Sequence, residues 1–148
     1  MKIIEKDLTF YFPTIRTVDR LGTLCGVSGE FKPFFYDIET TGLARKTTNL
    51  YLIGVVFPDG ERWVMRQWFA EGPEEEEAIL EKFAEFSKAF SHTVQFNGNK
   101  FDAPYIRERC SVYGLESPLD SVPGLDLYQF LKPIRLLLQL DHMRQADV

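Results

Sequence analysis

Two carboxylates are the clearest candidates for chemistry in this sequence. Asp37 and Glu39 stand two residues apart within residues 34–43, Phe-Phe-Tyr-Asp-Ile-Glu-Thr-Thr-Gly-Leu. The aromatic residues and Ile38 favour a buried strand. Alternate side chains of a strand point to the same face, so we expect Asp37 and Glu39 to lie side by side. Neighbouring carboxylates repel each other, and a divalent cation is the partner best suited to relieve that repulsion.

The same pair also fits a structural interpretation, in which an edge strand carries two solvated acids. A bare Asp-x-Glu is a short pattern that arises often by chance. The aromatic run at 34–36 argues against an exposed edge, because such side chains need burial.

A third acid, Asp102, follows a short strand expected over 93–96 and a turn at 97–100. A helix is expected over 101–113, which places Asp102 in its first turn. Functional sites of open α/β sheets gather outside the carboxyl ends of strands, and Asp102 fits such a site. Asp is also a favoured N-cap residue, so Asp102 could simply cap the helix.

The composition is that of an ordinary globular chain. The 148 residues include 45% hydrophobic and 14% aromatic residues, enough for one domain with a core. The net charge of −5 is concentrated in residues 71–85, which hold seven acids and one lysine. We expect a helix there, with its glutamates on a solvated face and an apolar stripe formed by Ala78, Ile79, Phe83, Phe86 and Phe90. The acidity neither excludes nor supports a polyanionic substrate.

Compartment and membrane association follow from similar signals. No apolar run approaches the length of a membrane span, and the charged start of the chain differs from a secretory leader. Cys25 and Cys110 lack metal-type spacing and are expected to be reduced thiols. These features predict a cytoplasmic protein with no membrane partner, and no obligate protein partner is evident.

The order of the expected elements predicts an α/β fold. The strands are expected over 34–39, 49–57 and 62–69, with a hairpin turn at 58–60, and over 93–96; the helices are expected after Pro73 and over 101–113 and 134–140. This order gives an antiparallel three-stranded unit, extended by a strand that follows a crossover helix, in a mixed sheet flanked by helices. Residues 1–33, with a short strand over 8–12, are expected to be an N-terminal extension packed on the 34–148 domain.

The two acidic stretches together resemble a known superfamily. Phe-Tyr-Asp-Ile-Glu-Thr-Thr-Gly-Leu at 35–43 and Phe-Asn-Gly-Asn-Lys-Phe-Asp-Ala-Pro-Tyr-Ile at 96–106 are similar to the first two motifs of the DEDD 3′–5′ exonucleases. The second stretch is especially similar to the motif of the proofreading domain in family B DNA polymerases. The whole layout resembles the stand-alone bacterial ribonuclease H-like exonuclease domains of the YprB type.

The resemblance implies a ribonuclease H-like fold and a two-metal hydrolysis of phosphodiester bonds at a single-stranded DNA or RNA end. It implies that Asp37, Glu39 and Asp102 are the catalytic and metal-binding acids, holding two Mg²⁺ or Mn²⁺ ions. The substrate-binding residues that it implies are Thr40, Asn97 and Phe101. Asp126 resembles a structural or substrate-side position of the family.

The fourth carboxylate of the superfamily is not matched in the same way. His142 and Asp147 have a permitted spacing, but they follow a leucine-rich element directly and stand at the chain end. We expect Asp147 not to reach the metal site, because chain ends usually fray, and we expect a domain that is incomplete at its C-terminus. Two other functions stay open: a nucleic-acid-binding or interaction module with a degenerate, inactive site, and a phosphatase-like enzyme acting on a small substrate.

Overall fold

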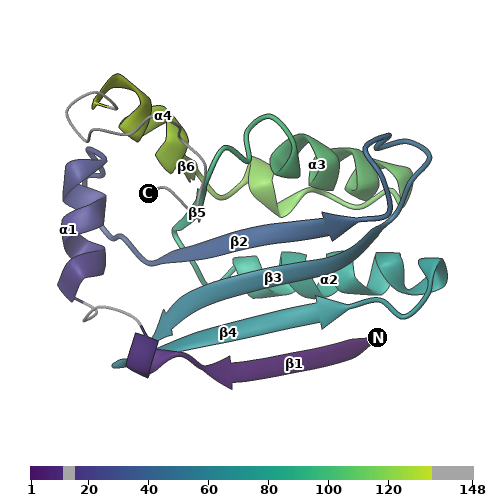
Figure 1. Cartoon of the computed structure of the whole chain (residues 1–148), viewed down its shortest axis with the longest axis horizontal. Helices are drawn as coiled ribbons and strands as arrows, with labels where there is room; N and C mark the ends of the chain where they lie inside the picture. The colour runs from purple at the N-terminus through teal and green to yellow at the C-terminus, as the bar shows by residue number, and fades with distance from the viewer. Residues whose placement is uncertain (12–15, 135–148) are drawn as a thin grey trace.

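The structure, a computed structural model, describes residues 1–11 and 16–134. Its centre is a mixed sheet of six strands in the order β1-β4-β3-β2-β5-β6 (Figure 1). The strands are β1 (Lys2–Asp7), β2 (Pro33–Thr40), β3 (Leu50–Asp59), β4 (Arg62–Phe69), β5 (His92–Gln95) and β6 (Gly124–Asp126). The α-helices are α1 (Arg16–Leu24), α2 (Glu76–Ser87), α3 (Asp102–Val112) and α4 (Leu127–Leu131). Short 3-10 helices span Thr9–Tyr11, Pro73–Glu75, Pro118–Asp120 and Lys132–Ile134.

The pairing of the strands confirms the predicted fold class. β2, β3 and β4 form an antiparallel unit, and β5 adds to β2 in parallel after the crossover through α2. β6 then adds to β5, also in parallel. The turn between β3 and β4 has Gly60 at a φ of 61°, a conformation that glycine adopts without strain. β2 is therefore a central strand, and the interpretation of its acids as residues of an edge strand is wrong.

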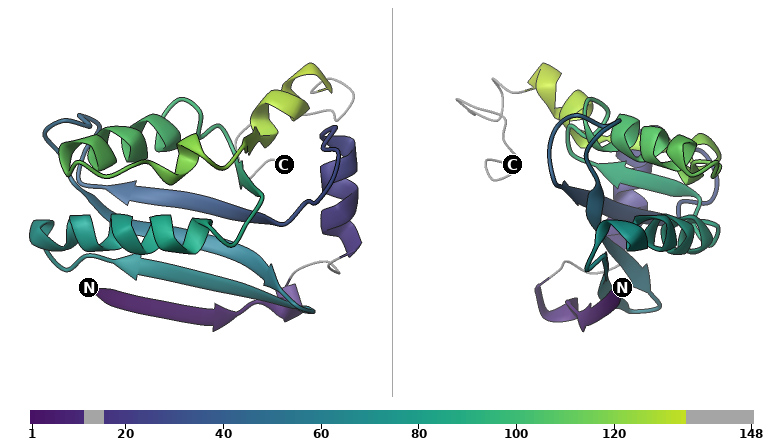
Figure 2. Two further views of the ribbon diagram at one scale, coloured as in Figure 1. Left: turned by 180° about the vertical axis from the view of Figure 1, so that it is seen from behind. Right: turned by 90° about the vertical axis from the view of Figure 1, so that its right-hand side faces the viewer.

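The core lies between the sheet and the helices α2 and α3, which cover the same face (Figure 2). The apolar stripe of α2 supplies Phe83 and Phe86 to this core. The ring of Phe34 on β2 lies 5.8 Å from that of Phe83, and the ring of Phe57 on β3 lies 5.0 Å from that of Phe86. Even-numbered side chains of β2 therefore pack toward the helices, and its odd-numbered side chains point to the opposite face.

The N-terminal part differs from the expectation. β1 joins the same sheet by pairing with β4, whereas the strand expected over residues 8–12 is wrong, since Thr9–Tyr11 form a 3-10 helix. Every residue of β1 is exposed. An edge strand with charges on both of its faces lacks the alternation of polar and apolar residues that would identify it in a sequence. The division of the chain at residue 33 stays a prediction.

The C-terminal part of the described chain contains elements too short to be recognised by periodicity. β6 has three residues and α4 has five. Ile134, where a helix over 134–140 was expected to begin, is the last residue of a 3-10 helix, and residues 135–140 lie outside the described residues. In the part of the chain that the structure describes, no helix has the length and apolar character needed to cross a membrane.

Candidate functional site

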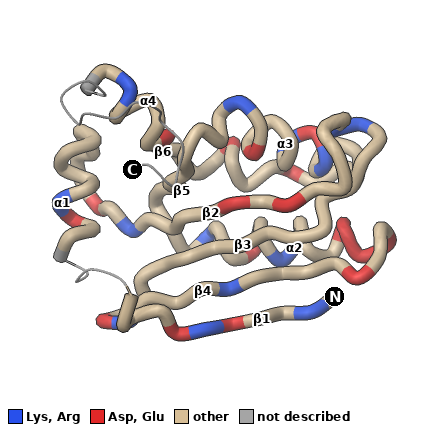
Figure 3. Tube along the Cα trace, viewed as in Figure 1, with Lys and Arg blue, Asp and Glu red and all other residues tan. Residues whose placement is uncertain are grey.

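The two acids of β2 lie on the face of the sheet away from α2 and α3. Phe34, Tyr36 and Ile38 are buried, whereas Asp37 and Glu39 between and after them are exposed. Figure 3 shows these acidic positions along β2, in the middle of the sheet. The predicted placement of both acids on one strand face is confirmed by this alternation.

A shallow pocket opens beside these acids. It has a volume of about 350 Å³ and is lined by Asp37 and Glu39 together with apolar and polar residues of β3 and β4, namely Leu52, Gly54, Val56, Met65 and Gln67. Asp37 stands opposite Gly54 in the ladder, so no side chain of β3 lies directly beside its carboxylate. Although Asp37 is exposed, its surroundings desolvate the carboxylate and raise its pKa.

β2 ends at Thr40, the residue after Glu39. The register with β3 shifts between Glu39 and Thr40, so a bulge turns the chain into the loop that precedes β3. The hydroxyl of Thr40 donates to the carbonyl of Gly42 at 3.0 Å, so this side chain closes the turn. A role of Thr40 in substrate binding stays a prediction.

Asp102 is the first residue of α3 and does not cap it. The N-cap position belongs to Phe101, and no side chain hydrogen-bonds there. The carboxylate of Asp102 is half-buried, and its pKa rises to about 7, first through burial and then through the negative charges of Asp37, Asp126 and Glu39. The capping interpretation is therefore wrong, and Asp102 lies in the same electrostatic field as the acids of β2.

Asp126 has a structural role at this end of the sheet. Its buried carboxylate accepts hydrogen bonds from the backbone N–H groups of Asn97 at 2.8 Å, Asn99 at 3.3 Å and Tyr128 at 3.1 Å. It thereby fixes the turn that leads to Asp102 and caps α4. Asn97 is exposed on this turn and has a φ of 59°.

Gln95 is a site residue that the sequence reasoning missed. Its amide oxygen accepts a hydrogen bond from the hydroxyl of Tyr36, and its amide nitrogen donates to Asn99 Oδ1 at 2.5 Å. A Cβ on Gly98 would lie 2.5 Å from Gln95 Oε1 and 2.8 Å from Asp102 Oδ2, so a larger residue there would displace one or both of these side chains. The available signal was a polar residue inside the short strand expected over 93–96, two residues before Asn-Gly-Asn.

Phe101, His142 and Asp147 are the other residues that the sequence offered for the site. The ring of Phe101 is half-buried and packs on Tyr105, with 5.4 Å between the ring centres, so it contributes to the core beside the site. His142 and Asp147 lie outside the described residues. Within residues 1–11 and 16–134, no three acids, histidines or cysteines are gathered closely enough to hold a metal ion. The negative charges of Asp37, Glu39 and Asp102 therefore interact, but the three carboxylates are not close enough together to form a closed set of metal ligands.

Glu76 was predicted on a solvated helix face, and that prediction is wrong. Its carboxylate is fully buried and forms an ion pair with Arg109, at 2.6 Å from the nearest guanidinium nitrogen. The sequence could not separate Glu76 from the neighbouring glutamates, because its partner on α3 is distant in the chain.

The sheet order, with helices on one face and acids on the other, defines a ribonuclease H-like α/β domain. The model of the RNase H superfamily matches residues 34–144, and the chain belongs to this superfamily. No curated protein matches the chain.

Solved structures share the fold at low sequence identity. The family B DNA polymerase from the hyperthermophilic archaeon Pyrobaculum calidifontis is 21% identical with a TM-score of 0.58, over 72% of this chain and 17% of the polymerase. A metal-free complex of Escherichia coli exonuclease I with single-stranded DNA is 14% identical with a TM-score of 0.57, over 73% of this chain and 30% of the exonuclease. The zinc-bound form of that complex is 13% identical with a TM-score of 0.56, over 80% and 32% of the two chains. This chain therefore spans less than half of each of these proteins.

Proposed function

We propose that this domain is a metal-dependent nuclease that shortens single strands of DNA or RNA from their 3′ ends. The observation that carries the proposal is the placement of Asp37 and Glu39 on the exposed face of the central strand β2, with Asp102 at the start of α3. Burial, and then the charges of Asp37, Asp126 and Glu39, raise the pKa of Asp102, which supports this grouping. Membership of the RNase H superfamily supports this chemistry. The likeness in fold to exonuclease I, which has been solved with single-stranded DNA, supports the substrate class.

The donor set fits hard divalent cations. Carboxylate oxygens suit Mg²⁺ and Mn²⁺, and a cation near Asp102 would offset the repulsion that raises its pKa. We propose that Asp37 contacts two ions, that Glu39 holds one of them and that Asp102 holds the other. Such a pair of ions, when bound, activates a water and stabilises the leaving oxygen. Thr40, Asn97 and Phe101 are the proposed contacts for the nucleic acid strand.

A degradation assay tests the proposal. The protein is incubated with Mn²⁺ and 5′-labelled single-stranded DNA or RNA, beside Asp37→Asn and a chelator control. We expect a ladder of products shortened from the 3′ end that is lost in both controls. Circular single-stranded DNA separates the two modes of cleavage, because an exonuclease leaves a circle intact. Cleavage of the circle, or a ladder that persists with chelator, would contradict the proposal.

A second function follows from the open arrangement of the acids. Among the described residues no closed ligand cage forms, which favours a module that binds a nucleic acid strand without cutting it. Fluorescence anisotropy with the same oligonucleotides distinguishes the two functions. Binding that is unaffected by metal, with no shortening of the strand, would identify the binding module.

A further inference from the structure

The separation of Asp102 from the acids of β2 is not set by the sheet. The parallel ladder between β2 and β5 pairs Pro33–Phe35 with His92–Val94. It ends before Asp37, so at the level of the acids no ladder hydrogen bond of this pair ties the two strands. The position of Asp102 relative to β2 therefore depends on contacts outside this ladder, which include the Tyr36–Gln95 hydrogen bond and the turn that Asp126 fixes.

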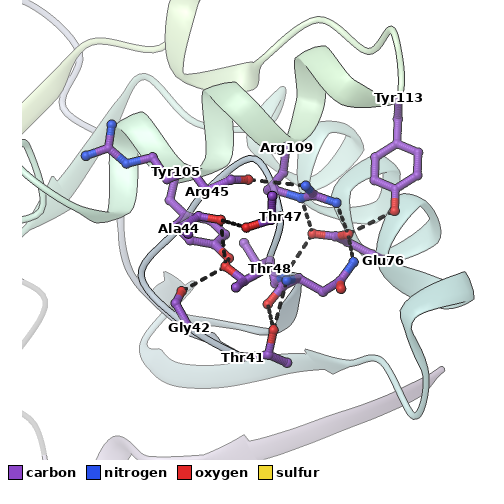
Figure 4. A network of polar contacts seen from close by, with 12 residues as sticks. Thr41, Gly42, Ala44, Arg45, Thr47, Thr48, Glu76, Tyr105, Arg109 and Tyr113 are labelled. Atoms are coloured by element: carbon purple, nitrogen blue, oxygen red, sulfur yellow. Dashed lines mark hydrogen bonds and ion pairs between the residues drawn. The ribbon is translucent and has the colours of Figure 1, made fainter.

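The loop 41–49 between β2 and β3 connects the end of β2, which carries the acids, to α3. Arg109 Nη1 on α3 donates to the carbonyl of Arg45 at 3.2 Å, and the hydroxyls of Thr48 and Tyr105 lie 2.7 Å apart (Figure 4). Arg45 Nη2 donates to the carbonyl of Lys100 at 3.2 Å, directly before α3. The loop that leaves the acids of β2 is therefore tied to the helix that begins with Asp102.

Glu76 joins this loop, α2 and α3 through one buried carboxylate. It accepts hydrogen bonds from Arg109 Nε at 2.7 Å and Nη2 at 2.6 Å, so the pair is bidentate. It also accepts from Asn49 Nδ2 and from the N–H of Leu50, each at 2.7 Å, where the loop enters β3. The hydroxyl of Tyr113 donates to it at 2.9 Å. The loop end and α3 thus share one anchor.

Stability alone is a weak reason for this arrangement. Glu76 has 0% of its surface exposed and Arg109 has 4%, so both charges are desolvated. Replacing a buried ion pair by apolar residues of similar volume is often neutral or stabilising. What the pair provides beyond an apolar contact is direction, since a bidentate guanidinium fixes the orientation of both partners.

We propose that Glu76 and Arg109 are positioning residues, which hold the loop 41–49 on α3 and so set the distance between Asp102 and the carboxylates of β2. The inference rests on the proposed function, because the acids that it positions are the proposed metal ligands. Loss of a residue that hydrogen-bonds to a metal ligand commonly changes metal affinity by about 10–100-fold. Glu76 and Arg109 contact no proposed ligand, so we expect an effect at the lower end of that range. The pair would act in this way through the backbone, without touching metal or substrate.

The test compares two double variants. Glu76→Met with Arg109→Met removes the anchor without leaving a charge buried. As a control, Glu5→Met with Arg66→Met removes a second Arg–Glu pair, which is partly exposed and joins β1 to β4 away from the loop. Thr48→Val removes the contact with Tyr105 together with the hydrogen bonds from the Thr48 hydroxyl to the carbonyls of Gly42 and Ala44, and it provides a milder second probe of the loop. Mn²⁺ affinity is measured by titration calorimetry at a temperature at which circular dichroism shows each protein to be folded.

We expect the anchor variant to bind Mn²⁺ about 10-fold more weakly than wild type, and the control to bind within about twofold of wild type. Thr48→Val should weaken binding in the same direction, and it decides the matter if the anchor variant does not fold. If the folded anchor variant binds Mn²⁺ as tightly as wild type, the inference is overturned while the proposed metal site still stands. If the anchor variant does not fold, wild-type affinity in Thr48→Val has the same meaning. A wild-type protein that binds no Mn²⁺ refutes the proposed metal site, and the inference with it.

Discussion

Two groups of carboxylates in this domain are built in opposite ways. Glu76 is fully buried, yet Arg109, Asn49 and the N–H of Leu50 surround it with donors. Burial alone would raise its pKa, but these hydrogen bonds outweigh burial and the pKa is lowered. Asp102 is only half-buried, and its pKa rises to about 7 through burial and neighbouring acids.

The difference shows what each group requires. Glu76 has its counter-charge within the chain, so it is complete in the folded protein. The charged groups that shift the pKa of Asp102 are Asp37, Asp126 and Glu39, and all three are acids. Such a cluster is relieved by a proton or by a cation from solution, so the two groups differ in the source of their balancing charge.

The largest effect that we expect comes from breaking the complete group. Arg109→Met leaves the charge of Glu76 buried without its counter-charge. This should lower the free energy of unfolding by about 3–5 kcal/mol. Urea denaturation at neutral pH measures it. Adding Glu76→Met should recover most of the loss, because the uncompensated charge is gone. Equal losses in the single and double variants would refute the role assigned to the ion pair.

The next effect concerns the cation that we propose for Asp37, Glu39 and Asp102. Mg²⁺ at about 100 times its dissociation constant should raise the free energy of unfolding by about 2.7 kcal/mol, if it binds only the folded protein. Asp37→Asn should abolish this increase. Denaturation of both proteins in Mg²⁺ and in chelator provides the comparison, and an equal increase in both would remove Asp37 from the metal site.

A smaller effect follows from the pKa of Asp102. The folded protein retains a proton on Asp102 up to about pH 7, whereas the ordinary value is 3.8. This group therefore stabilises the fold below about pH 4, and its contribution is lost as the pH rises through 7. Without metal, Asp102→Asn should be more stable than wild type at pH 8 by about 1–2 kcal/mol. This is well below the full shift of roughly three pKa units, because water screens the charge at this half-buried site. Parallel stability–pH curves of the two proteins would contradict this.

The smallest effect sharpens the contrast within the glutamate run. Glu77 is exposed on α2, directly beside the buried Glu76. Glu77→Gln should change the free energy of unfolding by less than about 0.5 kcal/mol, as surface substitutions usually do. Glu76→Gln, measured in the same urea titration, should cost several times more. Similar effects of the two changes would place Glu76 on the surface.

The sequence predicted the features that depend on local pattern. The alternation at 34–39 predicted both the central strand and the shared face of Asp37 and Glu39, and the helix that starts near Asp102 follows from its turn and its first residues. The features that depend on distant partners were beyond it. Glu76 resembles its neighbours until α3 supplies Arg109, and β1 becomes a strand only because β4 offers a free edge.

The position of β1 also has a consequence for the behaviour of the protein in solution. β4 is rich in large apolar side chains, including Trp63, Val64 and Trp68, and β1 covers the edge of this strand. The strand at this edge of the sheet is instead β1, whose residues are all exposed and mostly charged. Lysines and other charges on a rim strand discourage pairing with another molecule. β1 therefore protects the protein from aggregation. Without β1, the unpaired backbone groups of β4 could hydrogen-bond to a strand of another molecule.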